Sequence, residues 1–188
     1  MGNEVADPGW ARRTFGHDIT EQLLVLIPTA ICNAHQRAAS GHAGVATATL
    51  EAYGCGLHAA QFEELAAALE PLPGAQPRSV RGRAVIVLDR HAFYPMRVGN
   101  VGKTNGRPSP FRVEFTRRYG PEPLQEPLEG MPETPEEIAL REGVGVLPED
   151  TRLVLVAYVC ALQTGLTELR WGRAELDKAG TITWHRGS

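Results

Sequence analysis

The chain has 188 residues, of which 43% are hydrophobic and 22% are charged, and its formal net charge is −3 at pH 7. This composition is ordinary for a globular protein that folds without disulfides. The chain has three cysteines, an odd number, and they are widely spaced: Cys32, Cys55 and Cys160. This pattern argues against the disulfide framework of a secreted protein, so we expect a cytoplasmic location. The longest apolar stretch, 23–32, is too short to span a bilayer, so we expect no membrane partner.

The charge changes sign between two neighbouring blocks of the sequence. Residues 78–118 contain ten Lys or Arg and two Asp or Glu, whereas residues 119–150 contain one Lys or Arg and nine Asp or Glu. This pattern favours an anionic partner, self-association, or neutralisation of one block by the other.

The first third of the chain has the pattern of helices. Asp18 and Glu21 are spaced as in a capping box, and apolar residues follow at helical spacing up to Ala34. Pro28 lies inside this pattern and predicts a kink or break, because proline removes a backbone donor.

A turn is predicted at residues 40–44 (SGHAG), and residues 45–53 fit either a strand or a helix. A second helical stripe begins at Phe62, and Pro71 ends it. The Pro-rich stretch 71–80 is predicted to be a linker.

After residue 80 the pattern changes to that of strands. Residues 84–89 (AVIVLD) predict a buried strand, and residues 111–115 (FRVEF) alternate with the period of a strand. Residues 93–98 predict a poorer strand because Pro95 cannot donate to a ladder.

Residues 120–133 are predicted to be irregular, and a short helix is predicted near 135–142, capped by Thr134. The remaining sequence predicts an antiparallel meander, with strands at 152–162, 166–176 and 181–184 and a turn at 177–180. Gly172 is predicted to mark a bulge or bend in the second of these strands.

These elements predict an α+β fold in one domain, 1–188. A helical layer from residues 18–70 would pack on a mostly antiparallel sheet formed by 83–116 and 152–185, with the sheet part of the chain running from 83 to 188.

Residues 98–106 (VGNVGKTNG) contain the Gly-Lys-Thr ending of a phosphate-binding loop. The first glycine of that motif is replaced by Arg97, and Pro108 and Pro110 prevent the helix that should follow. We therefore expect no ATP or GTP site and predict a flexible, basic turn.

The basic block supplies the leading functional hypothesis, a non-enzymatic binding module. Guanidinium groups suit phosphate and carboxylate oxygens, and glycines let a ligand approach the backbone. The anionic partner would be a nucleic acid, a phosphate ligand or an acidic protein surface. The candidate anion-binding residues within 97–118 are Arg97, Lys103, Arg107, Arg112, Arg117 and Arg118.

Two C-x-x-H pairs, Cys32 with His35 and Cys55 with His58, have side chains that zinc accepts. They make a site only if the two helices place the pairs opposite each other. The alternative is two buried thiols and two surface histidines, so no cofactor is favoured and zinc is the less favoured alternative.

The enzymatic alternative is a metal-dependent nuclease or phosphodiesterase. Asp89 and Glu114 would hold a divalent metal and Lys103 would position the attacking water. The usual lysine position, two residues after the second acid, is Thr116 here. The third hypothesis is a structural subunit of an assembly.

Overall fold

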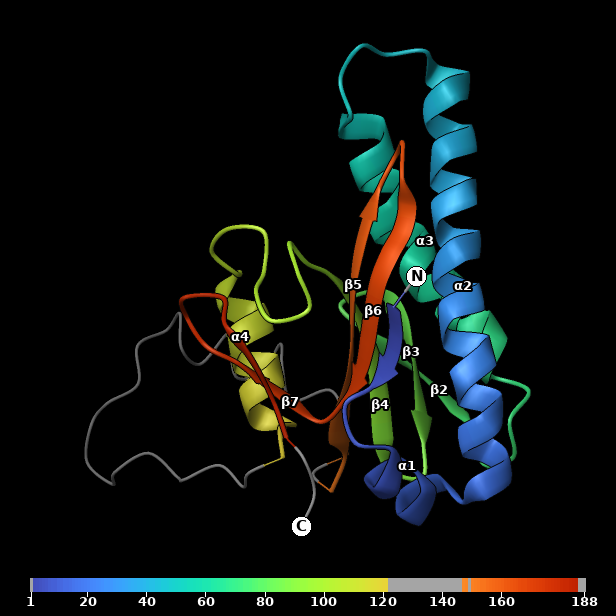
Figure 1. Ribbon diagram of the computed structural model, residues 1–188, viewed down its shortest axis with the longest axis vertical. Helices are drawn as coiled ribbons and strands as arrows, with labels where there is room; N and C mark the ends of the chain where they lie inside the picture. The colour runs from blue at the N-terminus through green and yellow to red at the C-terminus, as the bar shows by residue number, and fades with distance from the viewer. Residues whose placement is uncertain (1, 122–146, 149, 186–188) are drawn as a thin grey trace.

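The computed structural model of the chain describes residues 2–121, 147–148 and 150–185. A six-stranded mixed sheet, with strand order β1-β6-β5-β4-β3-β2, forms its centre (Figure 1). Two of its five strand pairs, β4–β5 and β1–β6, are parallel, and the other three are antiparallel. The strands are β1 (Gly2–Val5), β2 (Gln76–Val80), β3 (Arg83–Leu88), β4 (His91–Arg97), β5 (Arg152–Ala161) and β6 (Gly165–Gly172).

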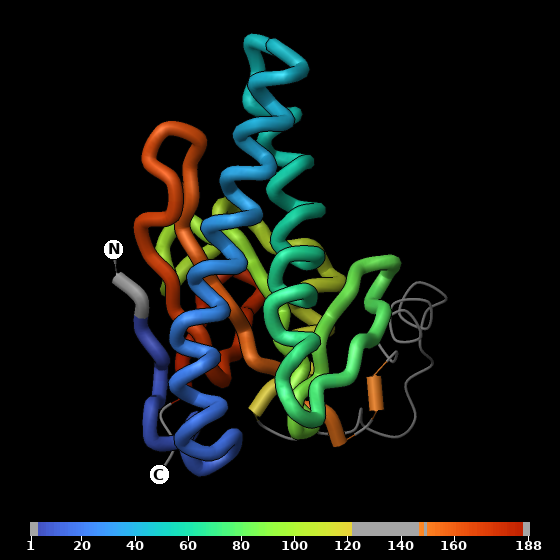
Figure 2. The backbone as a smooth tube through the Cα atoms, turned by 90° about the vertical axis from the view of Figure 1, so that its right-hand side faces the viewer, coloured from blue at the N-terminus to red at the C-terminus, as the bar shows by residue number. Residues whose placement is uncertain are grey.

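Three helices cover one face of this sheet: α1 (Pro8–Phe15), α2 (His17–Val45) and α3 (Glu51–Leu69). α2 and α3 form an antiparallel pair whose tip projects beyond the sheet (Figure 2). Alternate side chains of the central strands, such as Val154, Val156 and Tyr158, pack under the helices. The predicted α+β class, with N-terminal helices on a mostly antiparallel sheet, is confirmed.

The opposite face carries a second core beneath α4 (Pro110–Arg118) and a small sheet of β7 (Ala174–Leu176) and β8 (Ile182–Trp184). The sheet residues that alternate with those of the first core, such as Leu153 and Leu155, pack here. The prediction of one domain over 1–188 stays a prediction.

α2 continues through Pro28 without a break and also through the predicted turn at 40–44. A proline inside a helix costs roughly 3 kcal/mol. Ile27 and Ile31 on either side of it are fully buried, and each contributes about 1.5–3 kcal/mol. Burial therefore outweighs the lost hydrogen bond. The helix ends at Val45, and Ala46 follows with φ 53°.

The linker predicted at 71–80 is wrong in its second half, because residues 76–80 form β2. β2 is an edge strand, which tolerates Pro77, and it pairs with β3 in a hairpin. Arg81 and Gly82 connect the two strands with φ of 50° and 73°, the signs that a two-residue type I′ turn requires.

The strand predicted at 111–115 is also wrong, because these residues lie in α4. Ser109 caps this helix through its side-chain oxygen, which accepts from the Arg112 N–H, and Pro110 occupies the first turn. Phe111 and Phe115 fit a strand at alternate positions, but they are also four residues apart. On the helix their rings stack at 5.5 Å on the second core.

Residues 93–98 were predicted to be a poor strand, yet β4 is central and regular. The Val98 N–H donates to the Tyr158 carbonyl on β5, so by the alternation of a strand Pro95 directs its nitrogen away from β5, toward β3. The ladder between β3 and β4 ends at Phe93, so no partner needs the missing donor.

The predicted strands 84–89 and 152–162 correspond to β3 and β5, and the bend at Gly172 is confirmed. β6 ends at Gly172, where φ is 149°, and the chain then enters the second sheet. The helix predicted near 135–142 and most of the irregular segment 120–133 lie outside the described residues. Among the described helices, none is long and apolar enough to cross a membrane.

Candidate anion-binding site

β3 and β4 separate after a short stretch of pairing. Their ladder runs only from Leu88↔His91 to Ile86↔Phe93. Beyond it, β3 pairs only with β2, and β4 pairs only with β5. Side chains from both layers meet at this separation: Phe62 on α3 contacts Tyr94 on the opposite face, with ring centroids 5.4 Å apart.

Four arginines act by their charge on His58, Tyr94 or Tyr158 near this point, and we call them the arginine cluster: Arg81, Arg83, Arg97 and Arg112. The four arginines come from three secondary-structure elements and one turn. Arg81 is in the β2–β3 turn, Arg83 begins β3, Arg97 ends β4, and Arg112 is in the first turn of α4.

Arg112 shares one neighbouring side chain with each of the other three arginines: Tyr94 with Arg81, His58 with Arg83 and Tyr158 with Arg97. Arg112 lies against the Tyr94 hydroxyl, and its charge and that of Arg83 both act on His58. The charges of Arg97 and Arg112 both act on Tyr158. The separation of β3 and β4 thus lets Arg112, from one side of the sheet, approach α3 on the other side.

Two cluster members are held by contacts with aromatic rings. The Arg81 guanidinium lies 4.7 Å from the Phe111 ring centroid, and that of Arg97 lies 5.7 Å from the Tyr53 ring centroid. Arg97 Nε also donates a 2.8 Å hydrogen bond to the Cys160 carbonyl. These contacts hold the cations without neutralising them.

Among the described residues, no carboxylate lies within ion-pair distance of any arginine of the cluster. The described part of the chain carries 17 Lys or Arg and 14 Asp or Glu, so acidic side chains are available elsewhere on it. Like charges that act on the same neighbouring side chains also repel one another, and a bound anion offsets that repulsion.

His58 adds a neutral donor to the cluster. Gln61 Nε2 lies 3.0 Å from His58 Nδ1, and since an amide N–H₂ only donates, Nδ1 accepts and the proton is on Nε2. Packing against Phe62, with ring centroids 5.8 Å apart, removes water from the ring. This loss of water, followed by the charges of Arg112 and Arg83, lowers the pKa of His58.

The cluster rests on two buried polar networks. In the first, the Tyr158 hydroxyl donates to Gln61 Oε1 at 2.8 Å. In the second, the Tyr53 hydroxyl contacts His35 Nδ1 at 2.9 Å and Cys160 Sγ at 3.4 Å. Burial raises the pKa of the Cys160 thiol, which keeps it protonated and unreactive.

The basic turn at 98–106 is not arranged to hold phosphate. Its N–H groups at Gly99, Asn100, Gly102, Lys103 and Thr104 all donate to oxygens of the chain. Thr104 is buried and bonds to Gly180, in the turn between β7 and β8. Phosphate-binding loops keep such N–H groups free for the ligand.

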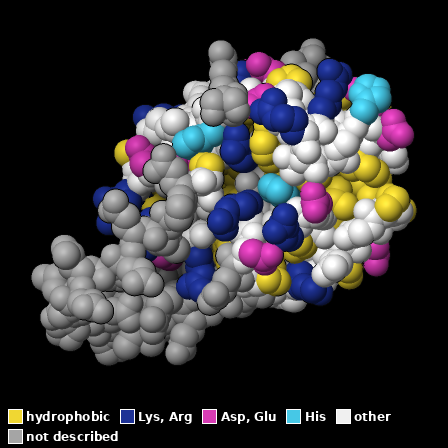
Figure 3. All heavy atoms as spheres, turned by 90° about the horizontal axis from the view of Figure 1, so that it is seen from below, with side chains coloured by type: hydrophobic (Ala, Val, Ile, Leu, Met, Phe, Trp, Pro, Cys, Tyr) yellow, Lys and Arg dark blue, Asp and Glu magenta, His cyan; other side chains and the backbone are white. Residues whose placement is uncertain are grey.

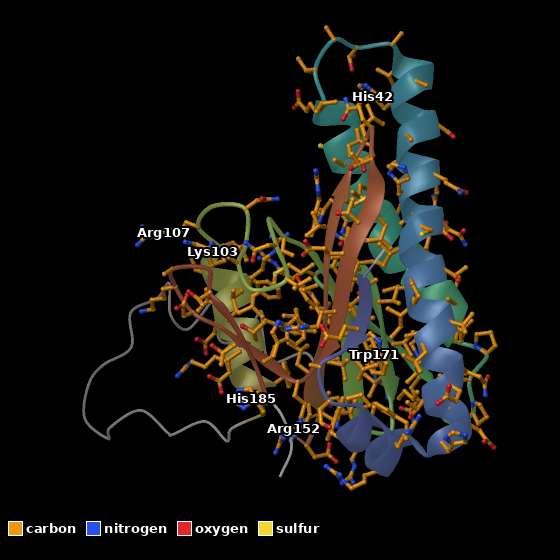
Figure 4. All side chains as sticks on the ribbon, in the orientation of Figure 1. His42, Lys103, Arg107, Arg152, Trp171 and His185 are labelled. Carbon is orange, nitrogen blue, oxygen red and sulfur yellow. The ribbon has the colours of Figure 1, made fainter. Side chains whose placement is uncertain are left out.

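The six predicted anion-binding residues therefore do not form one surface. Arg97 and Arg112 belong to the cluster. Lys103 and Arg107 lie on the exposed loop between β4 and α4 (Figure 4). Arg117 binds both oxygens of Glu114, at 3.0 and 2.7 Å, and the Arg118 guanidinium lies 6.0 Å from the Tyr119 ring centroid.

The three residues of the nuclease hypothesis are not brought together. Asp89 is in the turn before β4, and Lys103 follows the other end of this seven-residue strand, so they are separated by roughly 20 Å. Glu114 lies on α4 and pairs with Arg117. Their arrangement is not that of a metal-dependent nuclease.

The two C-x-x-H pairs also do not form a shared site. His35 contacts Tyr53, His58 contacts Gln61, and Cys55 is exposed. Within 2–121, 147–148 and 150–185, no group of three or more His, Cys, Asp or Glu is placed to hold a metal ion.

Sequence reasoning missed Arg81, Arg83 and His58 as members of the site. His58 was considered only as a zinc ligand, and the linker prediction hid the β2–β3 hairpin. Gly82, which lies between Arg81 and Arg83, could have indicated this hairpin, because glycine is typical of the second position of a two-residue hairpin turn.

No family model, curated protein or solved structure matches this chain.

Proposed function

We propose that this protein is a binding module whose arginine cluster, together with His58, holds a phosphate group of an anionic partner. The observation that carries this proposal is that four arginines act by their charge on the neighbouring side chains His58, Tyr94 and Tyr158, while no carboxylate of the described residues lies within ion-pair distance of any of them.

The form of the cluster favours phosphate over a single carboxylate. Several positive charges that act on the same few side chains match a dianion better than a monoanion. Guanidinium forks bind phosphate oxygens through paired hydrogen bonds, and the His58 Nε2–H adds a further donor. Because Arg112 shares a neighbouring side chain with each of the other three, the arginines form a group that suits one discrete phosphate better than a long polyanion.

Titration calorimetry with phosphoserine at low ionic strength tests the proposal, with serine as the unphosphorylated match. Arg83→Gln and Arg112→Gln should each weaken phosphoserine binding by about tenfold or more, because each removes charge-assisted hydrogen bonds. Arg78→Gln is the matched control: Arg78 lies on the same hairpin but bonds to Gln76. Equal affinity in all four proteins, or no binding by the wild type, would contradict the proposal.

Arg81 separates a binding role from a structural one. A non-glycine residue with φ of 50° is strained, and asparagine tolerates this conformation better than arginine. Arg81→Asn should therefore leave the free energy of unfolding within about 1 kcal/mol of wild type while weakening phosphoserine binding. Loss of stability with unchanged binding would assign Arg81 a structural role.

The hypothesis of an assembly subunit remains open to measurement of the oligomeric state. The nuclease hypothesis has no support in the positions of Asp89, Lys103 and Glu114.

A further inference from the structure

A separate pocket of about 500 Å³ lies at the opposite end of β4 from the arginine cluster. It lies where the α1–α2 junction, the turn after α3, the β3–β4 turn and the start of β5 meet. Figure 3 shows the molecule from this end, where hydrophobic atoms are visible between basic and acidic side chains.

The pocket has an apolar wall and an acidic rim. Phe15, Ile19 and Val87 supply apolar lining. Asp89, Asp150 and Arg90 line it, and Arg90 lies 3.9 Å from Asp150, so the three side chains together carry one negative charge. Asp89 has no cation within ion-pair distance among the described residues, which leaves its carboxylate available to a ligand.

A buried polar atom in the lining has no partner. Thr151 is only 1% exposed, and its Oγ1 makes no hydrogen bond with the chain, although its backbone N–H donates to Pro148. Nearly all buried hydroxyl groups in proteins have a hydrogen-bond partner. Because Thr151 lines the pocket, a ligand that reaches its hydroxyl would satisfy this buried polar atom.

We propose that this pocket binds a compact organic cation, a primary ammonium attached to an apolar or aromatic group. The ammonium has three donors, which suit the Asp89 carboxylate and the Thr151 hydroxyl. Its apolar part would lie against Phe15, Ile19 and Val87, and the aromatic face of Phe15 also attracts a cation. The Arg90–Asp150 contact, which is exposed on both sides, leaves Asp89 as the dominant charge.

This proposal is independent of phosphate binding, because the two sites share no residue. The test titrates phenethylamine into the ¹⁵N-labelled protein and follows amide signals. Phenethyl alcohol and phenylacetate are the neutral and anionic matches. Asp89→Asn removes the charge and Thr151→Val removes the hydroxyl with little change of shape. Glu168→Gln, on the exposed face of β6, is the matched control for charge.

We expect saturable shifts at Phe15, Val87 and Thr151 with phenethylamine and binding weaker by about tenfold or more with both matched compounds. Asp89→Asn should weaken phenethylamine binding by about tenfold, Thr151→Val should weaken it by a smaller factor, and Glu168→Gln should leave it unchanged. Equal binding of amine and alcohol, preference for phenylacetate, or no saturable shift with any compound would overturn the proposal.

Discussion

The Tyr158 hydroxyl donates a 2.8 Å hydrogen bond to Gln61 Oε1, and this bond joins the centre of the sheet to α3. Both side chains are at least 98% buried. Tyr158→Phe leaves the Gln61 oxygen buried without that donor, which costs about 1–3 kcal/mol. Urea unfolding monitored by circular dichroism measures the loss.

A double-mutant cycle identifies the cause. Gln61→Leu removes the acceptor, and the pair Tyr158→Phe/Gln61→Leu removes both partners, which is less costly than leaving one unsatisfied. The double variant should therefore lose less stability than the sum of the single variants. Strict additivity would show that the hydrogen bond contributes nothing specific.

Gly180 fixes the basic turn against the second sheet. A Cβ at Gly180 would lie 2.1 Å from Thr104 Oγ1 and 3.1 Å from the Gly106 carbonyl, and φ there is 86°. Gly180→Ala should cost more than about 2 kcal/mol, from steric overlap added to backbone strain. Gly74→Ala is the control, since φ is 81° and no atom lies within 4 Å of its Cβ position. If denaturant unfolding shows the same loss of stability for Gly180→Ala and Gly74→Ala, then the overlap with Thr104 relaxes at no cost.

The sequence allowed prediction of the elements whose burial follows from their own composition. The apolar runs of β3 and β5 and the stripes of α2 and α3 required no knowledge of distant residues. β1 could not be predicted, because this four-residue strand depends on pairing with β6, whose paired residues lie 166 positions further along the chain. α4 was mistaken for a strand because Phe111 and Phe115 satisfy both periods, and Ser109–Pro110 decides between them.

The site was predicted only as a region. The basic block was evident from the sequence, but the grouping of its arginines depends on where β3 and β4 separate. Near that separation the charges of Arg83 and Arg112 act on the same side chain, His58, whereas Arg117 pairs with Glu114. Periodicity within a segment carries no information on such a separation, since it depends on contacts between distant segments, such as that of Phe62 with Tyr94.

His91 makes stability depend on pH. Its ring packs on Trp10 at 5.6 Å and Phe15 at 5.3 Å. Burial lowers its pKa, and the charges of Arg90 and Arg173 act in the same direction, whereas Asp89 opposes them through its carbonyl and charge. Below about pH 6.5 the unfolded state therefore binds more protons than the folded state, and stability falls as the pH falls through this window.

Urea midpoints measured from about pH 8 to about pH 5 test this effect. His91→Phe keeps an aromatic ring but removes the titration, so its profile should be flatter than that of wild type. His58, whose pKa is also lowered, contributes to the slope in the same direction, and His58→Gln should reduce that contribution. A profile of His91→Phe parallel to that of wild type would contradict the role of His91.

The lowered pKa of His58 also couples anion binding to proton uptake. Partial loss of water and the charges of Arg112 and Arg83 favour the neutral ring in the free protein. A bound dianion favours the charged ring, so binding raises the pKa of His58 and affinity increases as the pH falls between the free and bound values. Sulfate is the suitable probe because it does not itself titrate in this range. Calorimetry should show net proton uptake and tighter sulfate binding at lower pH, both reduced in His58→Gln. If sulfate affinity has the same pH dependence in His58→Gln as in wild type, then His58 does not face the bound anion.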